Sequence, residues 1–253
     1  MTRQLSSAVH LQLDGPIAMI TVGTGKRRNA LNREDWQDLR TQLDELAGDL
    51  SVRAVVIQGA GGTFCAGSDM TEWVGADAEQ IEESFARMEA AFRAVERSPV
   101  PVVAVIRGDA AGAGCQLALA CDIRVMADTA RIGMPIARLG ILPSPAFAAR
   151  MLRLAGAELT GEMLYTGRSL DARRAVSIGL ASSRIAEQDL DSHLTQLLAD
   201  IARQPAVAIR AAKRALRVAT GEPPQQRIGP AVDHATFQRG INNFLGTTRA
   251  PTT

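Results

Sequence analysis

The chain has 253 residues, of which 46% are hydrophobic and 22% charged, and its 28 basic side chains nearly balance its 27 acidic ones. This hydrophobic content excludes a disordered chain, and the formal charge of +1 argues against nucleic acid or an anionic membrane as the main partner. The longest uncharged stretch in the middle of the chain, residues 110–121, is much shorter than the roughly 20 residues of a membrane-spanning helix, so no membrane insertion is expected.

The first half of the chain alternates predicted strands and helices. Residues 10–13 and 17–22 are predicted strands, because a turn sequence, Asp-Gly-Pro, separates two apolar runs. Apolar residues at helical spacing predict a helix over residues 33–50, with Asn32 as its N-cap. Two further strands, at 53–58 and 100–106, are apolar throughout and enclose a polar helix over residues 77–96.

The two apolar strands end in the same way. Gly59 and Gly108, 49 positions apart, each lead into small residues and a predicted helix start, which indicates a ββα-like unit used twice. Small residues let a ligand approach the backbone, and a helix start offers unpaired N–H groups, so the two loops could form an oxyanion hole. Tight packing of strand against helix explains the same glycines equally well.

The second half is predicted to be mainly helical. Strands are expected at 122–127, 131–134 and 181–185, and helices at 144–154, 158–165, 171–178, 189–202 and 206–219. A final helical segment is expected to end near Phe244.

The histidines and cysteines do not indicate a metal site or a reactive thiol. The three histidines are scattered without metal-ligand spacing, so no metal is expected. Cys65 and Cys115 have no basic neighbour in sequence that would lower a thiol pKa, and we interpret them as packing residues. The absence of a CxxC motif and of an apolar signal segment favours a cytoplasmic protein.

Several short motifs together resemble those of the enoyl-CoA hydratase/isomerase (crotonase) superfamily, in the family's order from end to end. They are RNALN (28–32), TFCAGSDM (63–70), GDAAGAGCQLALACD (108–122), ARIGMP (130–135), LG (139–140) and the stretches 164–179, 205–216 and 239–245. The resemblance implies an α/β fold, with a spiral of ββα units over residues 1–195 and a C-terminal helical trimerisation region over 196–253. It also implies an acyl-CoA thioester as ligand, no cofactor besides this coenzyme A, and a homotrimer or dimer of trimers.

The resemblance also implies roles for particular positions. The backbone N–H groups of Ser68 and Ala113 would form the oxyanion hole for the thioester carbonyl. Substrate-binding positions would be Arg28, Ala30, Ala66, Gly67, Asp69, Met70, Gly112, Pro135, Leu139, Ser144 and Phe244. Of these, Asp69 and Ser144 fit better as caps of the turn and helix that follow them than as catalytic groups.

One departure from the family bears on the chemistry. Hydratases of this family use two glutamates, and the corresponding positions here are Gln116 and Ile136. An amide cannot take up a proton as a carboxylate does, and isoleucine neither donates nor accepts. Because a positioned acid or base contributes typically about 10²–10⁴-fold, ordinary hydration is not expected. Gln116 fits either as a hydrogen-bond partner of the ligand or an ordered water, or as a buried structural amide.

Three functions stay open on the sequence alone. The protein acts on an acyl-CoA through the oxyanion hole, as in decarboxylation of a malonyl-type thioester or isomerisation of an activated enoyl-CoA; or it is a non-catalytic acyl-CoA carrier or sensor; or it shares only ancestry with the family. A carboxylate reaching the site from Glu72, Glu82 or Glu83 would favour an enzyme, and its absence would favour a binding protein.

Overall fold

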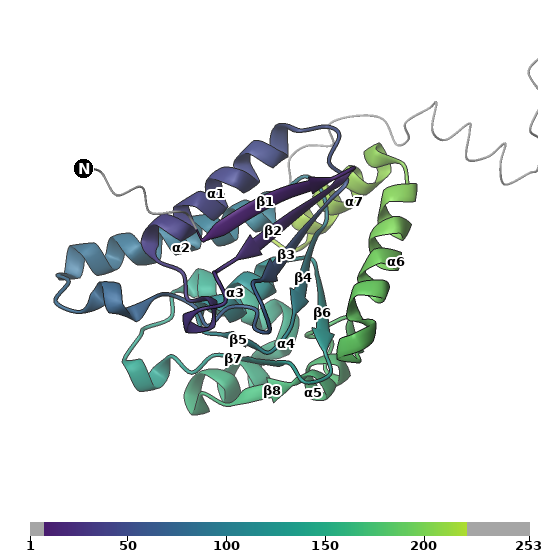
Figure 1. The fold of residues 1–253 in the computed structure, drawn as a ribbon. Helices are drawn as coiled ribbons and strands as arrows, with labels where there is room; N and C mark the ends of the chain where they lie inside the picture. The colour runs from purple at the N-terminus through teal and green to yellow at the C-terminus, as the bar shows by residue number, and fades with distance from the viewer. Residues whose placement is uncertain (1–7, 222–253) are drawn as a thin grey trace, which may run out of the picture.

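The structure, a computed structural model, describes residues 8–221, and its centre is a six-stranded sheet in the order β1-β2-β3-β4-β6-β9 (Figure 1). The strands are β1 (Val9–Asp14), β2 (Ile17–Val22), β3 (Ala54–Gly59), β4 (Val102–Ile106), β6 (Ile123–Ala127) and β9 (Ser183–Ile185). β1 and β2 are antiparallel across their short turn, and all the other pairs are parallel. β4 is buried along its whole length, as expected for a continuous apolar run in a parallel sheet.

A smaller sheet lies below the large one in Figure 1, in the order β5-β7-β8. Its strands are β5 (Asp109–Ala111), β7 (Arg131–Gly133) and β8 (Ser169–Asp171). Cys65 forms a parallel bridge with Ala110, and Ala110 pairs with Ile132, so the chain passes from the large to the small sheet after β3, β4 and β6. The ββα-like unit, which the sequence indicated twice, therefore occurs three times, beginning at β3, β4 and β6.

Each of these units is followed by a helix. These helices are α2 (Ala78–Arg97), α3 (Ala113–Ala120) and α4 (Pro145–Thr166), with the short η2 (Met70–Trp73) and η3 (Ala137–Leu139) before α2 and α4. The sequence predicted two helices in this region, at 144–154 and 158–165, and α4 agrees with that prediction, because it consists of two helices joined at Gly156, whose φ of 73° lies outside the helical region. The α/β fold class is confirmed.

The remaining helices lie outside these three units in the chain. They are η1 (Arg27–Asn29), α1 (Arg33–Gly48), α5 (Ala172–Ser177), η4 (Glu187–Asp189), α6 (Leu190–Arg203) and α7 (Ala206–Ala219). α1 starts at the predicted cap, where the Asn32 side chain accepts from the Asp35 N–H and the Asp35 carboxylate accepts from the Asn32 N–H. α1 packs on α2 through an edge-on contact of Trp36 with Phe92, and α6 runs on the other side of the sheet in Figure 1.

The C-terminal part is described only as far as α7. A buried ammonium fixes this helix, because Lys213 donates to the Asp122 carboxylate and to the Val100 carbonyl. The predicted division at 195/196 falls inside α6, so the two-part organisation stays a prediction, and Phe244 lies outside the described residues. Within residues 8–221, no helix combines the length and the apolarity needed to cross a membrane.

Candidate active site

The two glycine loops lie in direct backbone contact. A Cβ on Gly108 would lie 2.4 Å from the Gly62 carbonyl oxygen, and a Cβ on Gly114 would lie 2.0 Å from the Cys65 carbonyl oxygen. Real side chains cannot approach a backbone oxygen so closely, so only glycine fits at either position. These glycines therefore serve close packing, and this packing brings the end of one loop beside the other.

Two unpaired backbone donors meet where the loops touch. In the described part of the chain, the N–H groups of Ser68 and Ala113 donate to no protein acceptor. Ala113 is the first residue of α3, where an N–H is free as at any helix start. A Cβ on Gly67 would lie only 3.0 Å from the Ala113 nitrogen, which shows how close the Ser68 loop comes to α3.

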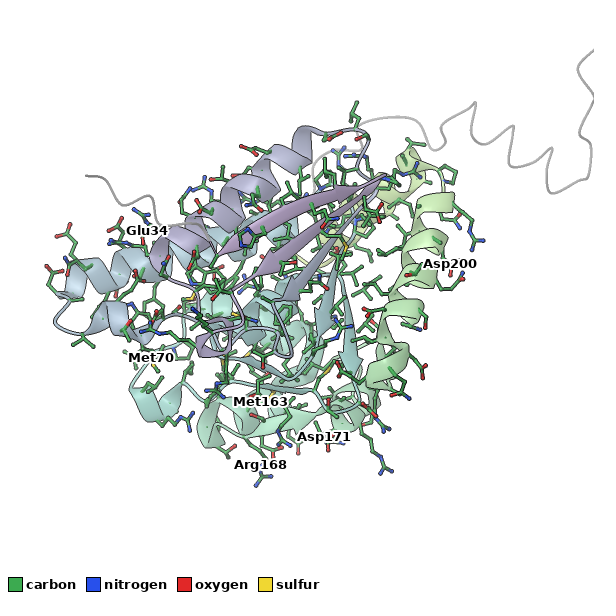
Figure 2. All side chains as sticks on the ribbon, in the orientation of Figure 1. Glu34, Met70, Met163, Arg168, Asp171 and Asp200 are labelled. Carbon is green, nitrogen blue, oxygen red and sulfur yellow. The ribbon has the colours of Figure 1, made fainter. Side chains whose placement is uncertain are left out.

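Ser68 and Ala113 both line a cavity of about 140 Å³. Most of the predicted site residues line it, namely Arg28, Ala66, Ser68, Met70, Gly112, Ala113, Pro135, Ile136 and Leu139. The rest of its wall is mainly apolar and includes Trp73, Phe85, Met88, Phe92, Ile141 and Phe147. Figure 2 labels Met70, which lies on the opposite side of the molecule from Asp200 of α6.

A strained turn presents one of these wall residues. Arg27, Arg28 and Asn29 all have positive φ, between 49° and 58°, which costs an L-residue about 1–2 kcal/mol each. The buried Asn29 side chain stabilises the turn, because its amide donates to the carbonyls of Ala60 and Thr63. The strained turn therefore holds Arg28 at the cavity wall.

Five predicted residues do not line this cavity: Ala30, Gly67, Asp69, Gln116 and Ser144. The hydroxyl of Ser144 accepts from a backbone N–H and caps α4, and the carboxylate of Asp69 accepts from the Thr71 N–H. Although partial burial alone would raise it, hydrogen bonds from Thr71 and Arg27 hold the pKa of Asp69 below its usual value. Both residues therefore act as caps in this structure.

The part of the wall that residues 8–221 form has no carboxylate or imidazole to transfer a proton. Among the described residues, no aspartate, glutamate or histidine lines the cavity, and Ile136 is 6% exposed. Of the carboxylates considered from the sequence, Glu72 accepts from the Arg33 N–H, Glu83 pairs with Arg87, and Glu82 lines an adjoining groove. The charged groups that reach the cavity from residues 8–221 are both arginines, Arg28 and Arg138.

The three thiols do not supply a nucleophile. Cys65, Cys115 and Cys121 are buried, and this burial raises the pKa of each thiol to about 12. A thiol with this pKa is almost fully protonated at neutral pH, so all three are inert packing residues. Residues 8–221 also contain no group of three potential metal ligands.

Comparison with known proteins identifies the family. A family model described as enoyl-CoA hydratase/isomerase matches residues 13–244, nearly the whole chain. The chain belongs to the enoyl-CoA hydratase/isomerase family. The sequence resemblance is thereby confirmed, and the free N–H groups of Ser68 and Ala113 stand in the loops on which it rested.

Relatives and solved structures extend this result. The chain is 34% identical to the 2,3-dehydroadipyl-CoA hydratase of Escherichia coli over 79% of its own length and 78% of that protein. It is 30% identical to the short-chain-enoyl-CoA hydratase of Clostridium acetobutylicum over 82% of its own length and 80% of that protein. The crystal structure of an enoyl-CoA hydratase/carnithine racemase from Magnetospirillum magneticum superposes on the chain with a TM-score of 0.82 at 29% identity. The superposition covers 96% of this chain and 89% of the Magnetospirillum protein.

This family member has a buried polar network that the sequence did not predict. Gln116 and Arg150 are 0% and 2% exposed, and the Gln116 side-chain oxygen accepts a hydrogen bond from Arg150. The same guanidinium pairs with Glu89 and Glu96 of α2 and lies 5.2 Å from the ring centre of Phe92. A signal was present, because Glu89, Phe92 and Glu96 recur at helical spacing and so share a face of α2.

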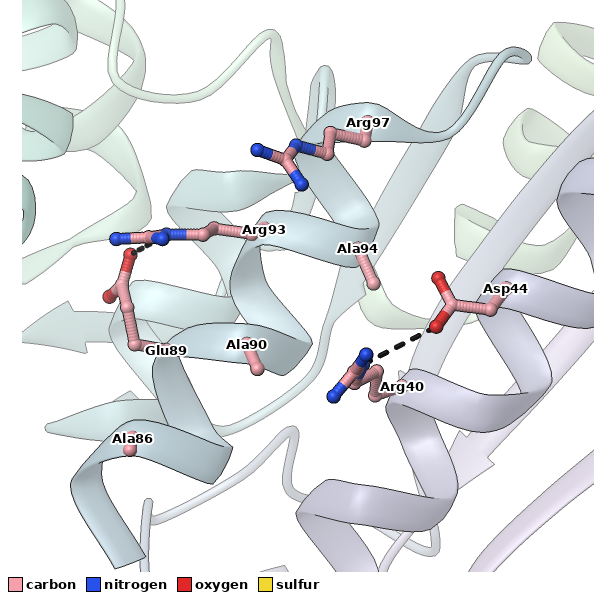
Figure 3. A pocket seen from close by; sticks show the side chains of 8 residues that line it. All are labelled: Arg40, Asp44, Ala86, Glu89, Ala90, Arg93, Ala94 and Arg97. Carbon is pink, nitrogen blue, oxygen red and sulfur yellow. Dashed lines mark hydrogen bonds and ion pairs between the residues drawn. The ribbon is translucent and has the colours of Figure 1, made fainter. Parts of the chain in front are cut away.

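Two further grooves flank α2. The larger, of about 790 Å³, adjoins the cavity and shares seven wall residues with it: Trp73, Phe85, Met88, Phe92, Leu139, Ile141 and Phe147. The other, of about 370 Å³, lies between α1 and α2 (Figure 3). Its charges are largely paired with one another, Arg40 with Asp44 and Arg93 with Glu89.

Proposed function

We propose that the protein binds an acyl-CoA thioester whose carbonyl oxygen accepts hydrogen bonds from the N–H groups of Ser68 and Ala113. The observation that carries this proposal is the pair of free donors on one small cavity, in a chain of the enoyl-CoA hydratase/isomerase family. The relatives named above are hydratases of enoyl-CoA esters, which agrees with a CoA thioester as ligand.

Two donors on a thioester oxygen favour reactions that place negative charge on this oxygen. Each such donor is worth about 2.7–4 kcal/mol in other enzymes, so an enolate would be stabilised strongly. In decarboxylation of a malonyl-type thioester, the bond to the carboxylate carbon breaks, its electron pair forms the enolate, and water then protonates the α-carbon. This reaction needs no base in the cavity wall, whereas hydration by two glutamates and isomerisation both need proton-transfer groups.

A non-catalytic acyl-CoA carrier or sensor is the second candidate. The wall around the donors is mainly apolar, and no described carboxylate or histidine reaches it. Such a wall holds an acyl group without promoting the addition of water. The carrier differs from the enolate-forming enzyme only in that the bound thioester is not converted to a product.

Mass spectrometry in deuterium oxide separates the two candidates. The full chain is incubated with crotonyl-CoA, a 3-enoyl-CoA, malonyl-CoA and a long-chain acyl-CoA. Loss of carbon dioxide or deuteration at the α-carbon would identify an enolate-forming enzyme. Retention of an acyl-CoA without any product would identify a carrier, and addition of water would contradict the argument from Gln116 and Ile136.

Variants of Ala113 test the oxyanion hole itself. Ala113→Pro removes one donor, and proline is well tolerated at the first position of a helix. Ala113→Gly is the control because it keeps the N–H. We expect the proline variant to bind acyl-CoA about tenfold more weakly or worse, in line with the loss of a strong hydrogen bond, and the glycine variant to bind normally. Equal binding by all three proteins would exclude Ala113 as a donor.

We also propose that the protein is a cytoplasmic homotrimer or dimer of trimers that needs no cofactor besides the coenzyme A of its ligand. Multi-angle light scattering would measure the assembly. Binding that persists after dialysis against a chelator would support the absence of a metal cofactor, and binding lost on dialysis and regained with a divalent cation would contradict it.

A further inference from the structure

Arg138 brings a positive charge to the cavity, and no acidic group of the described residues pairs with it. It lies in η3 and lines the cavity together with its neighbours Ile136 and Leu139. Within residues 8–221 its guanidinium forms no ion pair and no hydrogen bond. Arg28, the other cation of the wall, reaches the Asp109 carboxylate at 3.4 Å.

The surroundings of Arg138 favour an anionic ligand. The described wall contains no carboxylate, and its larger side chains are mostly apolar. Arg138 is exposed at the rim of the cavity, so solvent screens its charge, and it favours an anion that comes into direct contact with it. A guanidinium also matches a carboxylate in shape and can donate two parallel hydrogen bonds to it.

The position of Arg138 indicates which part of a thioester it faces. Ser68 and Ala113 mark the carbonyl, and two arms leave from there, the acyl group and the CoA body. Arg28 and Arg138 both line only the small cavity, but Leu139, next to Arg138, also lines the large adjoining groove, whose wall is mainly apolar apart from Glu82, Glu89 and Arg93. An apolar groove fits the acyl arm, and η3 therefore stands on the acyl side.

We infer that Arg138 selects acyl groups that carry a carboxylate of their own, by pairing with this carboxylate. The ligand class is a dicarboxylic acid bound to coenzyme A through one of its two carboxyl groups. This inference rests on the proposed binding of a CoA thioester and adds a specificity-determining residue to it.

Calorimetry with matched ligands tests the inference on the full chain. The pairs are butyryl-CoA with succinyl-CoA and hexanoyl-CoA with adipoyl-CoA, in which a methyl end is compared with a carboxylate at equal chain length. We expect the wild-type protein to prefer the carboxylate-ended ester of at least one pair by about threefold to fivefold, as for an ion pair with an exposed arginine. Arg138→Gln should lose this preference and bind the methyl-ended esters as before.

A charge-matched control completes the experiment. Arg173→Gln removes an exposed arginine of α5 that lines neither cavity nor groove, and it should keep the wild-type preference. Wild-type protein without any preference, or an unchanged preference in Arg138→Gln, would overturn the inference. So would an equal loss for all four esters and for free CoA, since Arg138 would then bind CoA phosphates. If the wild type binds no CoA ester at all, the proposed function itself fails.

Discussion

The side-chain oxygen of Gln116 accepts a hydrogen bond of 2.7 Å from the guanidinium of Arg150, and this contact fixes the orientation of the amide. Arginine can only donate, so the amide oxygen must face it and the NH₂ group must point away. The NH₂ group is buried and has no acceptor among the described residues. The position that the sequence resemblance matched to a hydratase glutamate therefore carries a buried hydrogen-bond donor here.

A carboxylate at this position should destabilise the protein more as the pH rises. In Gln116→Glu, the new carboxylate would be fully buried and would become the third around one guanidinium, after Glu89 and Glu96. Burial and repulsion between like charges raise a carboxyl pKa, and we expect them to outweigh the attraction of the shared guanidinium. An acid whose pKa is higher in the folded than in the unfolded protein destabilises the fold above its unfolded pKa, by up to about 1.4 kcal/mol for each pH unit that separates the two pKa values.

Urea unfolding at pH 4.5, 6 and 7.5 measures this effect. The difference in unfolding free energy between wild type and Gln116→Glu should grow over this range. Gln116→Met is the control, because it also loses the hydrogen bond but adds no charge, so its deficit should stay constant. A deficit of Gln116→Glu that does not change with pH would mean that Arg150 stabilises the new charge fully.

Arg150 should contribute far more to stability than its neighbour Arg153. Both donate to Glu96, but Arg150 is 2% exposed and Arg153 is 41% exposed in its side chain. Removing one partner of a buried pair leaves an uncompensated charge and typically costs about 3–5 kcal/mol, whereas exposed pairs contribute about 0–1 kcal/mol. We therefore expect a large loss of unfolding free energy in Arg150→Met and a small one in Arg153→Met, measured by urea unfolding. Similar losses in the two variants would refute this ranking.

The same network should make the protein sensitive to acid. Burial alone would raise the pKa of Glu96, but hydrogen bonds and charge from Arg150 and Arg153 outweigh it and lower this pKa. A carboxyl whose pKa is lowered on folding stabilises the protein above its unfolded pKa, near 4.3, and loses this contribution as the pH falls towards the folded pKa. The unfolding free energy should therefore fall between pH 5 and pH 3.

A pair of glutamine variants assigns this fall to Glu96. Glu96→Gln should be less stable than wild type at pH 7 but should lose less stability between pH 5 and pH 3. Glu158→Gln, at an exposed glutamate of α4 that forms no ion pair within residues 8–221, should follow the wild-type profile. The assignment is wrong if Glu96→Gln keeps the full wild-type dependence on pH.

Local patterns in the sequence predicted the elements whose conformation depends on their own residues. The cap at Asn32 and the bounds of α7 were both expected, because capping groups and helical periodicity are local signals. β5 was not expected. Its three residues, Asp-Ala-Ala, have little strand propensity, and they are extended because Cys65 and β7 flank them on either side.

In the candidate site too, features that depend on local motifs could be predicted, and contacts between distant residues could not. The free N–H groups of Ser68 and Ala113 and the apolar Ile136 could be predicted, because each belongs to a short motif. For the Arg150 network, only the shared face of Glu89 and Glu96 is a local signal. Arg150 itself is 54 positions from Glu96 and 61 from Glu89, so its contacts depend on the packing of α4 on α2 and could not be predicted. The same packing removes Gln116 from the cavity wall and makes it part of the network.

Gly67 should be the position where the smallest added side chain impairs ligand binding most. Its φ of 104° is strained for any residue with a Cβ, and a Cβ there would lie 3.0 Å from the Ala113 nitrogen, beside the proposed oxyanion donor. We expect Gly67→Ala to weaken acyl-CoA binding about tenfold or more, as one strong hydrogen bond to the carbonyl is lost. Gly62→Ala, in the same loop with open space around its Cβ, should bind as the wild type does in calorimetry. Normal binding by a folded Gly67→Ala variant would show that the carbonyl oxygen does not lie between the two loops.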